Sequence, residues 1–332
     1  MRLFGKYRVG ILLWGGLLSF VPLAAVWADL IVVANEQAGT LSIIDHESGV
    51  THTLQVGGDP HNLAATADGR RVVVTHPSAG MVSVIDPRAP TVLKRLTIPG
   101  RPHGVAIGPD DRWAVVGAET GRKLYLVDLR ELQIGEAFDL EPAPHNLIVT
   151  AAGQAWITAQ GARFLWLVDL EDGALIQRLQ TPAMPHDLAF SRQENALWVA
   201  NWESEDVYLV HGQPPRLETV RITGREPHHI VLTPDGREVW ITNHGSEDIS
   251  VIDATARRER ARIRVGDSPH HVAFSHDGRW AYVANSGSND VSVIDVAARR
   301  EVGRLPVGAH PHGIITVATD ALGLSPVSGA GR

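Results

Sequence analysis

Short apolar runs separated by polar turns recur along the chain after about residue 30. The clearest copy has three such runs, at 272–274, 280–284 and 291–294. The run Val291-Ser292-Val293-Ile294 alternates apolar and polar residues, which is the two-residue period of a strand with one buried face. No sustained period of 3.6 residues follows residue 28, so the pattern predicts an all-β protein.

Each repeat is predicted to contain four strands. The first follows a Pro-His step, as at 270–275, and an Asp-Gly turn at 277–278 leads to the second strand at 279–284. The third strand ends at Asp295, and the fourth covers 300–307. Glycine suits the tight turn because it adopts a positive φ without strain. Four-stranded units of about 40–45 residues are typical of β-propeller blades.

The Pro-His steps count the blades. They recur every 41 or 42 residues and end at His61, His103, His145, His186, His228, His270 and His312. One strand is predicted after His312, whereas the other three strand types open the chain at 30–35, 40–45 and 51–56. The two ends therefore share a blade, which closes the ring and leaves no open sheet edge. We expect one seven-bladed β-propeller over residues 29–320 and a loose tail at 321–332.

The first 28 residues have the pattern of a signal peptide. Three basic side chains within the first eight residues precede an apolar stretch at 9–21, and small residues lead to Ala28. A membrane anchor is the alternative, because residues 9–27 are close to spanning length. Pro22 and the small residues after it favour cleavage. We therefore expect export to a periplasm, with no membrane attachment of the mature chain.

Composition narrows the function. The 332 residues carry a formal net charge of −7, which becomes −10 without the first 28 residues. This balance is unfavourable for binding a phosphate backbone, so no nucleic-acid partner is expected. The absence of cysteine excludes disulfides, thiolate metal sites and covalently attached c-type haem. An exported protein without disulfides fits a bacterial periplasm, and we expect a monomer.

Three of the predicted second strands carry a family resemblance. Their sequences are Tyr-Val-Ala-Asn at 282–285, Trp-Val-Ala-Asn at 198–201 and Trp-Ile-Thr-Asn at 240–243. They resemble the YVTN β-propeller repeat, found in periplasmic YncE-like propellers, and the resemblance covers nearly all of the chain after residue 28. It implies the propeller fold but no single function, because propellers serve as binding proteins and as enzymes.

The strand order predicts that all seven histidines of the Pro-His steps lie on one face. The first strand runs along the axis away from its Pro-His step, and the second strand returns. The histidines therefore surround the mouth of the central channel, together with the loops after the second strands. These loops contribute His76, Glu119, Gln160, Trp202, Glu203 and His244. His229 and His271 directly follow two members of the ring.

The ring is a candidate site for a transition metal or a metallocofactor. Neutral imidazole binds Zn, Cu, Ni and Fe, and a tetrahedral site needs three or four nitrogens at about 2.0–2.1 Å. The candidate ligands for Cu or Zn are His228, His229, His244, His270 and His271, of which His228, His244 and His270 form the best local group. The candidate cofactor contacts are His61, His103, His145, His186 and His312. We expect the imidazoles to be neutral near pH 7 and metal binding to weaken below about pH 6.

Several alternatives compete with a metal site. The histidines would be structural if they only capped the inner strands, and seven strands around one channel could hold them too far apart for one ion. The d1-type haem propellers of nitrite reductases are similar in architecture, which implies haem bound through histidine alone. A lactonase-like or lyase-like enzyme would use Glu119 with Arg101 near the mouth. An interaction scaffold would present Trp202 to a protein partner.

Overall fold

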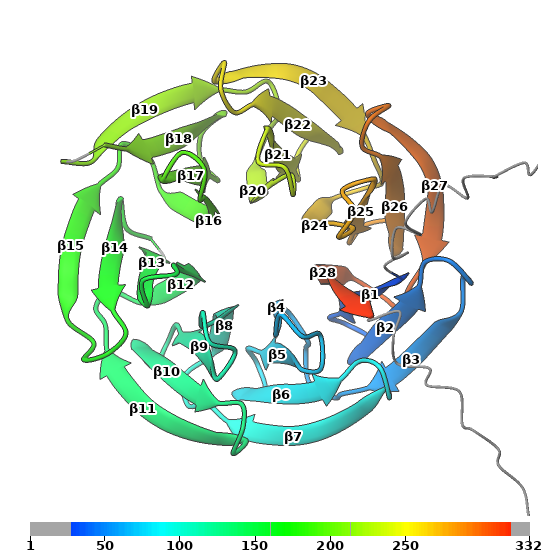
Figure 1. The fold of residues 1–332 in the computed structure, drawn as a ribbon, viewed down its shortest axis with the longest axis horizontal. Coiled ribbons are helices and arrows are strands. Elements are labelled where there is room, and N and C mark those ends of the chain that lie inside the picture. Colours follow the sequence, from blue (N-terminus) through cyan, green and yellow to red (C-terminus); the bar gives the residue numbers. More distant parts are fainter. Residues whose placement is uncertain (1–27, 160, 213, 320–332) are drawn as a thin grey trace, which may run out of the picture.

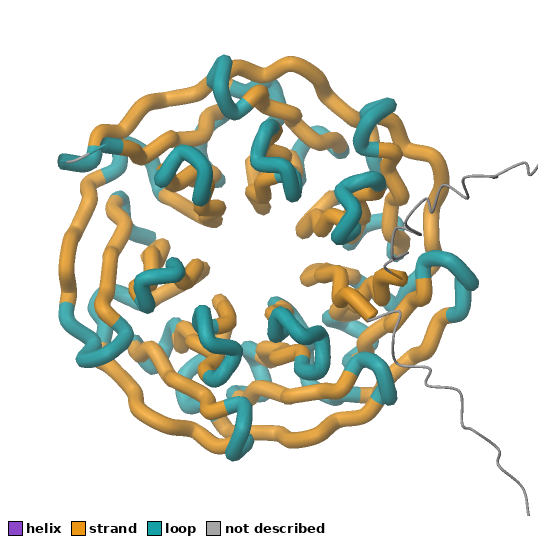
Figure 2. The backbone as a smooth tube through the Cα atoms, viewed as in Figure 1, coloured by secondary structure: helices purple, strands orange, loops and turns teal. Residues whose placement is uncertain are grey.

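The computed structural model describes residues 28–319 except 160 and 213. The predicted signal peptide, apart from Ala28, and the predicted tail lie outside these residues. The described chain forms seven four-stranded antiparallel sheets arranged around a central axis (Figure 1). The tube view in Figure 2 has only strands and loops in this part of the chain. The seven-bladed propeller predicted from the repeat is confirmed, and no helix of the described residues is long and apolar enough to cross a membrane.

The two inner strands of each blade carry the residues around the channel. The strands nearest the axis are β4 (Leu63–Ala65), β8 (Pro102–Ile107), β12 (Pro144–Val149), β16 (Pro185–Ser191), β20 (Pro227–Leu232), β24 (Pro269–Phe274) and β28 (Pro311–Thr319). The second strands are β5 (Val72–His76), β9 (Trp113–Ala118), β13 (Gln154–Ala159), β17 (Ala196–Asn201), β21 (Glu238–Asn243), β25 (Trp280–Asn285) and β1 (Ala28–Asn35).

The two outer strands complete each blade. The third strands are β6 (Met81–Asp86), β10 (Lys123–Asp128), β14 (Phe164–Asp169), β18 (Asp206–His211), β22 (Asp248–Asp253), β26 (Asp290–Asp295) and β2 (Thr40–Asp45). The outermost strands are β7 (Thr91–Thr97), β11 (Gln133–Asp139), β15 (Leu175–Gln180), β19 (Arg216–Arg221), β23 (Arg258–Arg264), β27 (Arg300–Pro306) and β3 (Thr51–Gln55). These outermost strands are largely exposed.

The two ends of the described chain share one blade, as predicted. Its strand order is β28-β1-β2-β3, with Ile31 paired to Thr316 in antiparallel register. Asp29 on β1 ties this blade to the neighbouring one, because its carboxylate accepts a hydrogen bond from the backbone N–H of His276 at 2.9 Å. The ring therefore closes through the main-chain ladder between β1 and β28, and the Asp29 side chain adds a contact between blades.

The hydrophobic core lies between the blades. Trp198 on β17 is fully buried and belongs to one apolar cluster with Val239 and Ile241 on β21 of the next blade. Trp240 on β21 packs in the same way against Phe274 on β24, with ring centroids 5.0 Å apart. The tryptophans of these second strands are thus packing residues between blades, and the packing of neighbouring blades fixes the innermost strands around the channel.

Candidate metal centre at the channel mouth

The seven histidines of the Pro-His steps form a closed ring of imidazoles. Each is in contact with its neighbours, and the neighbouring ring centroids lie 3.6–4.9 Å apart. The closest pair is His61 with His312, at 3.6 Å. The channel is therefore narrow at this level, and the expectation that seven strands would separate the imidazoles is wrong.

A β-bulge at each well-paired Pro-His step explains why the histidines face the axis. Pro227 pairs with Asn243, but the next pair is Ile230 with Ile241, so β20 carries one extra residue. The same shift follows Pro102, Pro144, Pro185, Pro269 and Pro311. A bulge bends the strand and redirects its side chains, and proline is compatible with this position because no ladder hydrogen bond needs its nitrogen.

Threonines on alternate second strands hold the bulges in place across blades. The Thr242 hydroxyl accepts a hydrogen bond from the backbone N–H of His229 at 3.0 Å and donates to the carbonyl of His270 in the next blade. Thr158 likewise bonds Asn146 N at 2.9 Å and the carbonyl of His186 at 3.1 Å. Each such threonine therefore links the positions of two successive ring histidines.

Three neighbouring members of the ring form a possible metal site. His228, His270 and His312 each offer a ring nitrogen within 4.8 Å of the other two. All three are at most 9 % exposed, and the Nδ1 atom of each is buried without a hydrogen-bond partner. Buried polar atoms are almost always paired in native proteins, so these unpartnered nitrogens make the three residues a candidate ligand set. We call these residues the three-histidine arc.

Burial keeps six members of the ring neutral, namely His61, His103, His186, His228, His270 and His312. It lowers the pKa of His61 to about 4 and of His186 to about 3, with the neighbouring imidazoles adding to the effect. It also holds the pKa values of His103, His228 and His312 well below the usual range. Neutral imidazoles provide the lone pairs that a metal needs, and these shifts place the loss of neutrality well below the predicted pH of about 6.

The opposite side of the ring has a different chemistry. His145 Nδ1 lies 2.7 Å from Glu119 Oε1, and His186 Nδ1 lies 2.9 Å from the carbonyl oxygen of His228. The two Nε2 atoms of this pair face each other at 3.3 Å. Glu119 is almost fully buried and pairs with Arg101 at 3.4 Å. His145 and Glu119 also form a possible metal group with His103.

Charged pairs form a rim outside the ring. The residue before each Pro-His proline adopts a positive φ in four blades, at Arg101, Glu226, Ser268 and His310. Their carbonyl groups accept hydrogen bonds from the residues that follow the second strands, Glu119, His244, Ser286 and Glu36. Side chains pair as well, with His244 3.2 Å from Glu226 and His310 3.3 Å from Glu36. The carboxylates of this rim favour the approach of cations to the mouth.

A second polar layer lies immediately inside the ring. The residues that follow the ring histidines line a cavity of about 150 Å³, with Asn62, Asn146, Asp187, His229 and His271 as its polar members. The His229 and His271 rings stack at 4.1 Å. His229 Nδ1 accepts the backbone N–H of Val272 at 3.3 Å, which leaves its Nε2 as the protonated nitrogen, 3.7 Å from Asp187. Burial raises the pKa of Asp187 to about 7.

The structure places the other predicted site residues at different depths. His244 lies beside the ring, with its centroid 5.0 Å from that of His270 and 6.3 Å from that of His228. His229 and His271 lie in the second layer, not in the ring. His76 is fully buried at the end of β5, and neither of its ring nitrogens has a hydrogen-bond partner. Gln160 lies outside the described residues.

Trp202 occupies the mouth, but it is not a free surface anchor. Its ring lies 5.2 Å from His186 and 5.3 Å from His228 by centroid distance, and it is half-buried. Packing against two ring members accounts for its place in the loop after β17. The expectation of an exposed tryptophan available to a protein partner is therefore not met by this geometry.

Two elements of the site were missed from the sequence. Asp187 follows the Pro-His step of its blade, in the same register as His229 and His271, so the alignment of repeats places it beside them. His310 precedes a Pro-His step, as Arg101 does, and the same alignment places it on the rim. The repeat contains both signals, because equivalent positions in equal blades lie at equal depth.

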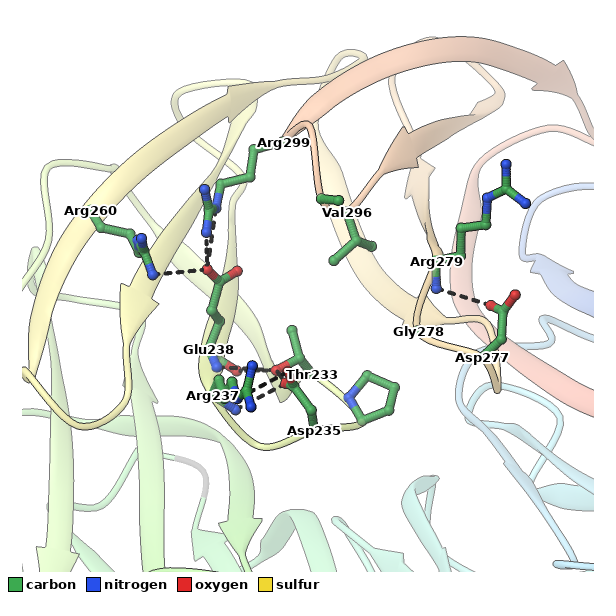
Figure 3. A pocket seen from close by; sticks show the side chains of 12 residues that line it. Thr233, Asp235, Arg237, Glu238, Arg260, Asp277, Gly278, Arg279, Val296 and Arg299 are labelled. Atoms are coloured by element: carbon green, nitrogen blue, oxygen red, sulfur yellow. Dashed lines mark hydrogen bonds and ion pairs between the residues drawn. The ribbon is translucent and has the colours of Figure 1, made fainter.

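A larger cavity lies at the turns of the opposite face, between the blades of β20–β23 and β24–β27. It measures about 430 Å³ and is lined by four arginines and three acidic residues (Figure 3). Glu238 pairs there with Arg299 and with Arg260, the latter at 3.4 Å, and accepts a hydrogen bond from Trp240 Nε1 at 3.0 Å. Its buried charge is thus compensated by the protein, unlike the orphaned nitrogens of the ring.

Solved structures with the same fold differ greatly in sequence. A functionally unknown protein from Desulfotomaculum acetoxidans is 16 % identical with a TM-score of 0.76, and the match covers 88 % of this chain and 99 % of that one. Apo AztD from Citrobacter koseri is 15 % identical with a TM-score of 0.67, covering 88 % and 98 %. The dihydro-haem d1 dehydrogenase NirN in complex with DHE is 17 % identical with a TM-score of 0.63, covering 86 % and 74 %.

At these identities the structural matches establish the fold alone. A search of curated protein sequences found no significant match. The family profile described as YNCE-like beta-propeller matches residues 13–321, which is nearly the whole chain. This protein therefore belongs to the YncE-like β-propeller family, as the Tyr-Val-Ala-Asn repeats led us to expect.

Proposed function

We propose that this protein binds a transition-metal ion, Zn²⁺ or Cu²⁺, at the mouth of its channel through His228, His270 and His312. The observation that carries the proposal is the set of three buried imidazoles with ring nitrogens within 4.8 Å of one another and unpartnered Nδ1 atoms. Three neutral imidazoles with an open fourth position form a common donor set for these ions. The signal-peptide pattern of residues 1–28 supports the proposal that this function is carried out in a periplasm.

A purely structural role accounts poorly for the ring. A histidine that caps a neighbouring blade would bond the backbone of that blade, and among the described ring members His186 does so through the His228 carbonyl. Five others have a buried Nδ1 atom with no partner: His61, His103, His228, His270 and His312. An unpaired buried polar atom costs about 1–3 kcal/mol, so five of them in one ring favour a ligand-binding role.

A single ion fits the ring better than a planar cofactor. NirN is in complex with DHE, so a ligand of that kind is compatible with the fold. In this chain, however, neighbouring imidazole centroids lie at most 4.9 Å apart around the whole ring. This spacing leaves no slot for a macrocycle between the imidazoles.

The test is elemental analysis of protein purified without chelator, followed by dialysis against Zn²⁺ or Cu²⁺. We expect near-stoichiometric metal in the wild-type protein and the loss of one ion in the His228→Ala/His270→Ala/His312→Ala variant. The matched control is His52→Ala/His211→Ala, which removes imidazoles outside the ring and should leave metal content unchanged. Wild-type protein that neither contains nor takes up metal would contradict the proposal.

A further inference from the structure

The His145–His186 pair has a geometry that the three-histidine arc lacks. Its Nε2 atoms are 3.3 Å apart, and the planes of the two rings are inclined at 65°. The pair comes from adjacent innermost strands, β12 and β16, and lies on the other side of the ring from His270 and His312. It shares no imidazole with the three-histidine arc.

The partners of the Nδ1 atoms determine which nitrogens carry protons. A backbone carbonyl only accepts, so His186 donates from Nδ1 to the His228 oxygen at 2.9 Å. A carboxylate also only accepts, so His145 donates from Nδ1 to Glu119 at 2.7 Å. A neutral imidazole has one N–H group. While both rings are neutral, the two Nε2 atoms therefore present lone pairs to each other at 3.3 Å, and only a cation held between them, a proton or a metal ion, gives them a common partner.

The spacing of the two nitrogens matches a metal ion in this shared position. Two nitrogens bound to one tetrahedral ion at about 2.0–2.1 Å are separated by about 3.3–3.4 Å, which is the spacing observed here. A carboxylate that accepts a hydrogen bond from the far nitrogen of a ligating histidine is a common outer partner of metal sites, since it fixes the tautomer and the ring orientation. Glu119 occupies this position, and Arg101 holds it from the other side.

We propose that His145 and His186 form a second metal site, with both Nε2 atoms as ligands and Glu119 as the positioning residue. The remaining coordination positions are open to water or to an exchangeable donor. The proposal extends the proposed function to a second ion and rests on it only for the class of ligand. Its ligands are distinct from His228, His270 and His312, so each site can be tested in the absence of the other.

Titration of the apo protein with Co²⁺, followed by visible absorption, tests the inference. We expect two ions in the wild-type protein and one in each of the variants His228→Ala/His270→Ala/His312→Ala and His145→Ala/His186→Ala. One ion in the second variant and none in the first would overturn the second site and leave the proposed function intact. The reverse result would establish the second site and remove the three-histidine site. No binding to the wild-type protein would remove both.

Glu119→Gln tests the positioning role while keeping all seven imidazoles, in case the alanine variants fail to fold. We expect about 10–100-fold weaker Co²⁺ binding at the His145–His186 site, with shifted absorption bands of that ion alone. Glu203→Gln, an exposed carboxylate in the loop after β17, is the matched control and should bind as the wild type does. Unchanged affinity and bands in Glu119→Gln would overturn the role of Glu119.

Discussion

The two sides of the histidine ring differ in what holds their imidazoles. In the three-histidine arc, each Nδ1 is buried and unpartnered, and the three rings contact one another as well as neighbouring aromatic side chains. In the His145–His186 pair, each Nδ1 has a fixed acceptor, Glu119 or the His228 carbonyl. The same repeat position therefore yields one adjustable and one preorganised set of donors. Identical residues at equivalent positions do not make equivalent sites, because the surrounding loop residues differ between blades.

This difference bears on the metal binding that we propose. Ligands that are already oriented lose less freedom when an ion binds, whereas unpartnered rings can adjust to ions of different size. The second layer adds to the contrast, because Asp187, His229 and His271 lie beneath the ring between the two sides. We expect the three-histidine arc to depend most on its own imidazoles and the pair to depend on Glu119 as well.

The largest effect that we expect is the loss of stability of the apo protein in acid. The pKa values of six ring histidines are lowered, to about 4 for His61 and about 3 for His186, so these side chains take up protons below about pH 6.5 in the unfolded chain but not in the folded one. The contribution of these neutral histidines to folding stability is thus fully present above pH 6.5 and is lost as the pH drops. Each such histidine contributes up to about 1.4 kcal/mol per pH unit. Over two pH units, several such histidines together remove an amount that approaches the whole free energy of unfolding of a typical protein, about 5–15 kcal/mol.

Thermal melts at pH 7.5, 6.5, 5.5 and 4.5, with chelator present, measure this loss. The melting temperature should fall steeply below pH 6.5, and saturating Zn²⁺ should restore part of it. His228→Gln/His270→Gln/His312→Gln should flatten the curve, whereas His52→Gln/His211→Gln should not. A melting temperature that is constant from pH 7.5 to 4.5 would contradict the neutral, buried ring.

The next largest effect distinguishes His312 from His244. The sequence analysis grouped His244 with His228 and His270. In the structure, His312 is the residue whose ring nitrogen lies within 4.8 Å of those of His228 and His270. We expect His312→Ala to weaken Zn²⁺ binding roughly 100–1000-fold, since a ligand contributes about a quarter of the 10–16 kcal/mol of a four-ligand site. His244→Ala should change binding by less than about threefold. Competition with a chromophoric chelator measures both, and equal losses would place the ion nearer to His244.

Two threonines provide a smaller and more local test of the two sides. Thr242→Val removes the bond to the His270 carbonyl, and Thr158→Val removes the bond to the His186 carbonyl. Each change keeps the side-chain shape and leaves buried backbone groups unpaired, which costs about 1–3 kcal/mol. We expect lower melting temperatures in both variants. Co²⁺ binding should weaken at the three-histidine site in Thr242→Val and at the His145–His186 site in Thr158→Val.

Much of the fold could be predicted from the sequence because the repeat is regular. The Pro-His spacing gave seven blades, the shared terminal blade and the common face of the histidines. The Trp and Val runs gave the second strands, as at β25, where 279–284 was expected and Trp280–Asn285 is observed. Each of these features follows from local pattern and from the equivalence of blades.

The finer structure of the site did not follow from the pattern. The sequence cannot give the width of the channel, which depends on how closely the bulged strands approach one another. Gly313 illustrates this approach, because a Cβ atom at that position would lie 2.3 Å from the His61 carbonyl oxygen. The hydrogen-bond partner of each Nδ1 atom could not be predicted from the repeat either, since Glu119 reaches His145 from a different blade. Contacts between blades therefore decide what the ring can bind, and a single repeat does not encode them.

The smallest effect concerns a histidine outside the ring, whose pH dependence has the opposite sign. His276 Nδ1 lies 2.7 Å from Asp29, and this hydrogen bond raises the pKa of His276. The stabilisation that protonated His276 provides is therefore fully present below about pH 6.5, and it is lost as the pH rises through the raised pKa. Because 41 % of the side chain is exposed, solvent screens the pair and the effect stays below about 1 kcal/mol. His276→Gln should lower the melting temperature at pH 6 and have no effect at pH 9.

Asp29→Asn is the control, since it also weakens the bond to the His276 backbone and should destabilise at both pH values. A larger effect of His276→Gln at pH 9 than at pH 6 would show that the Asp29 pair does not set the charge of His276.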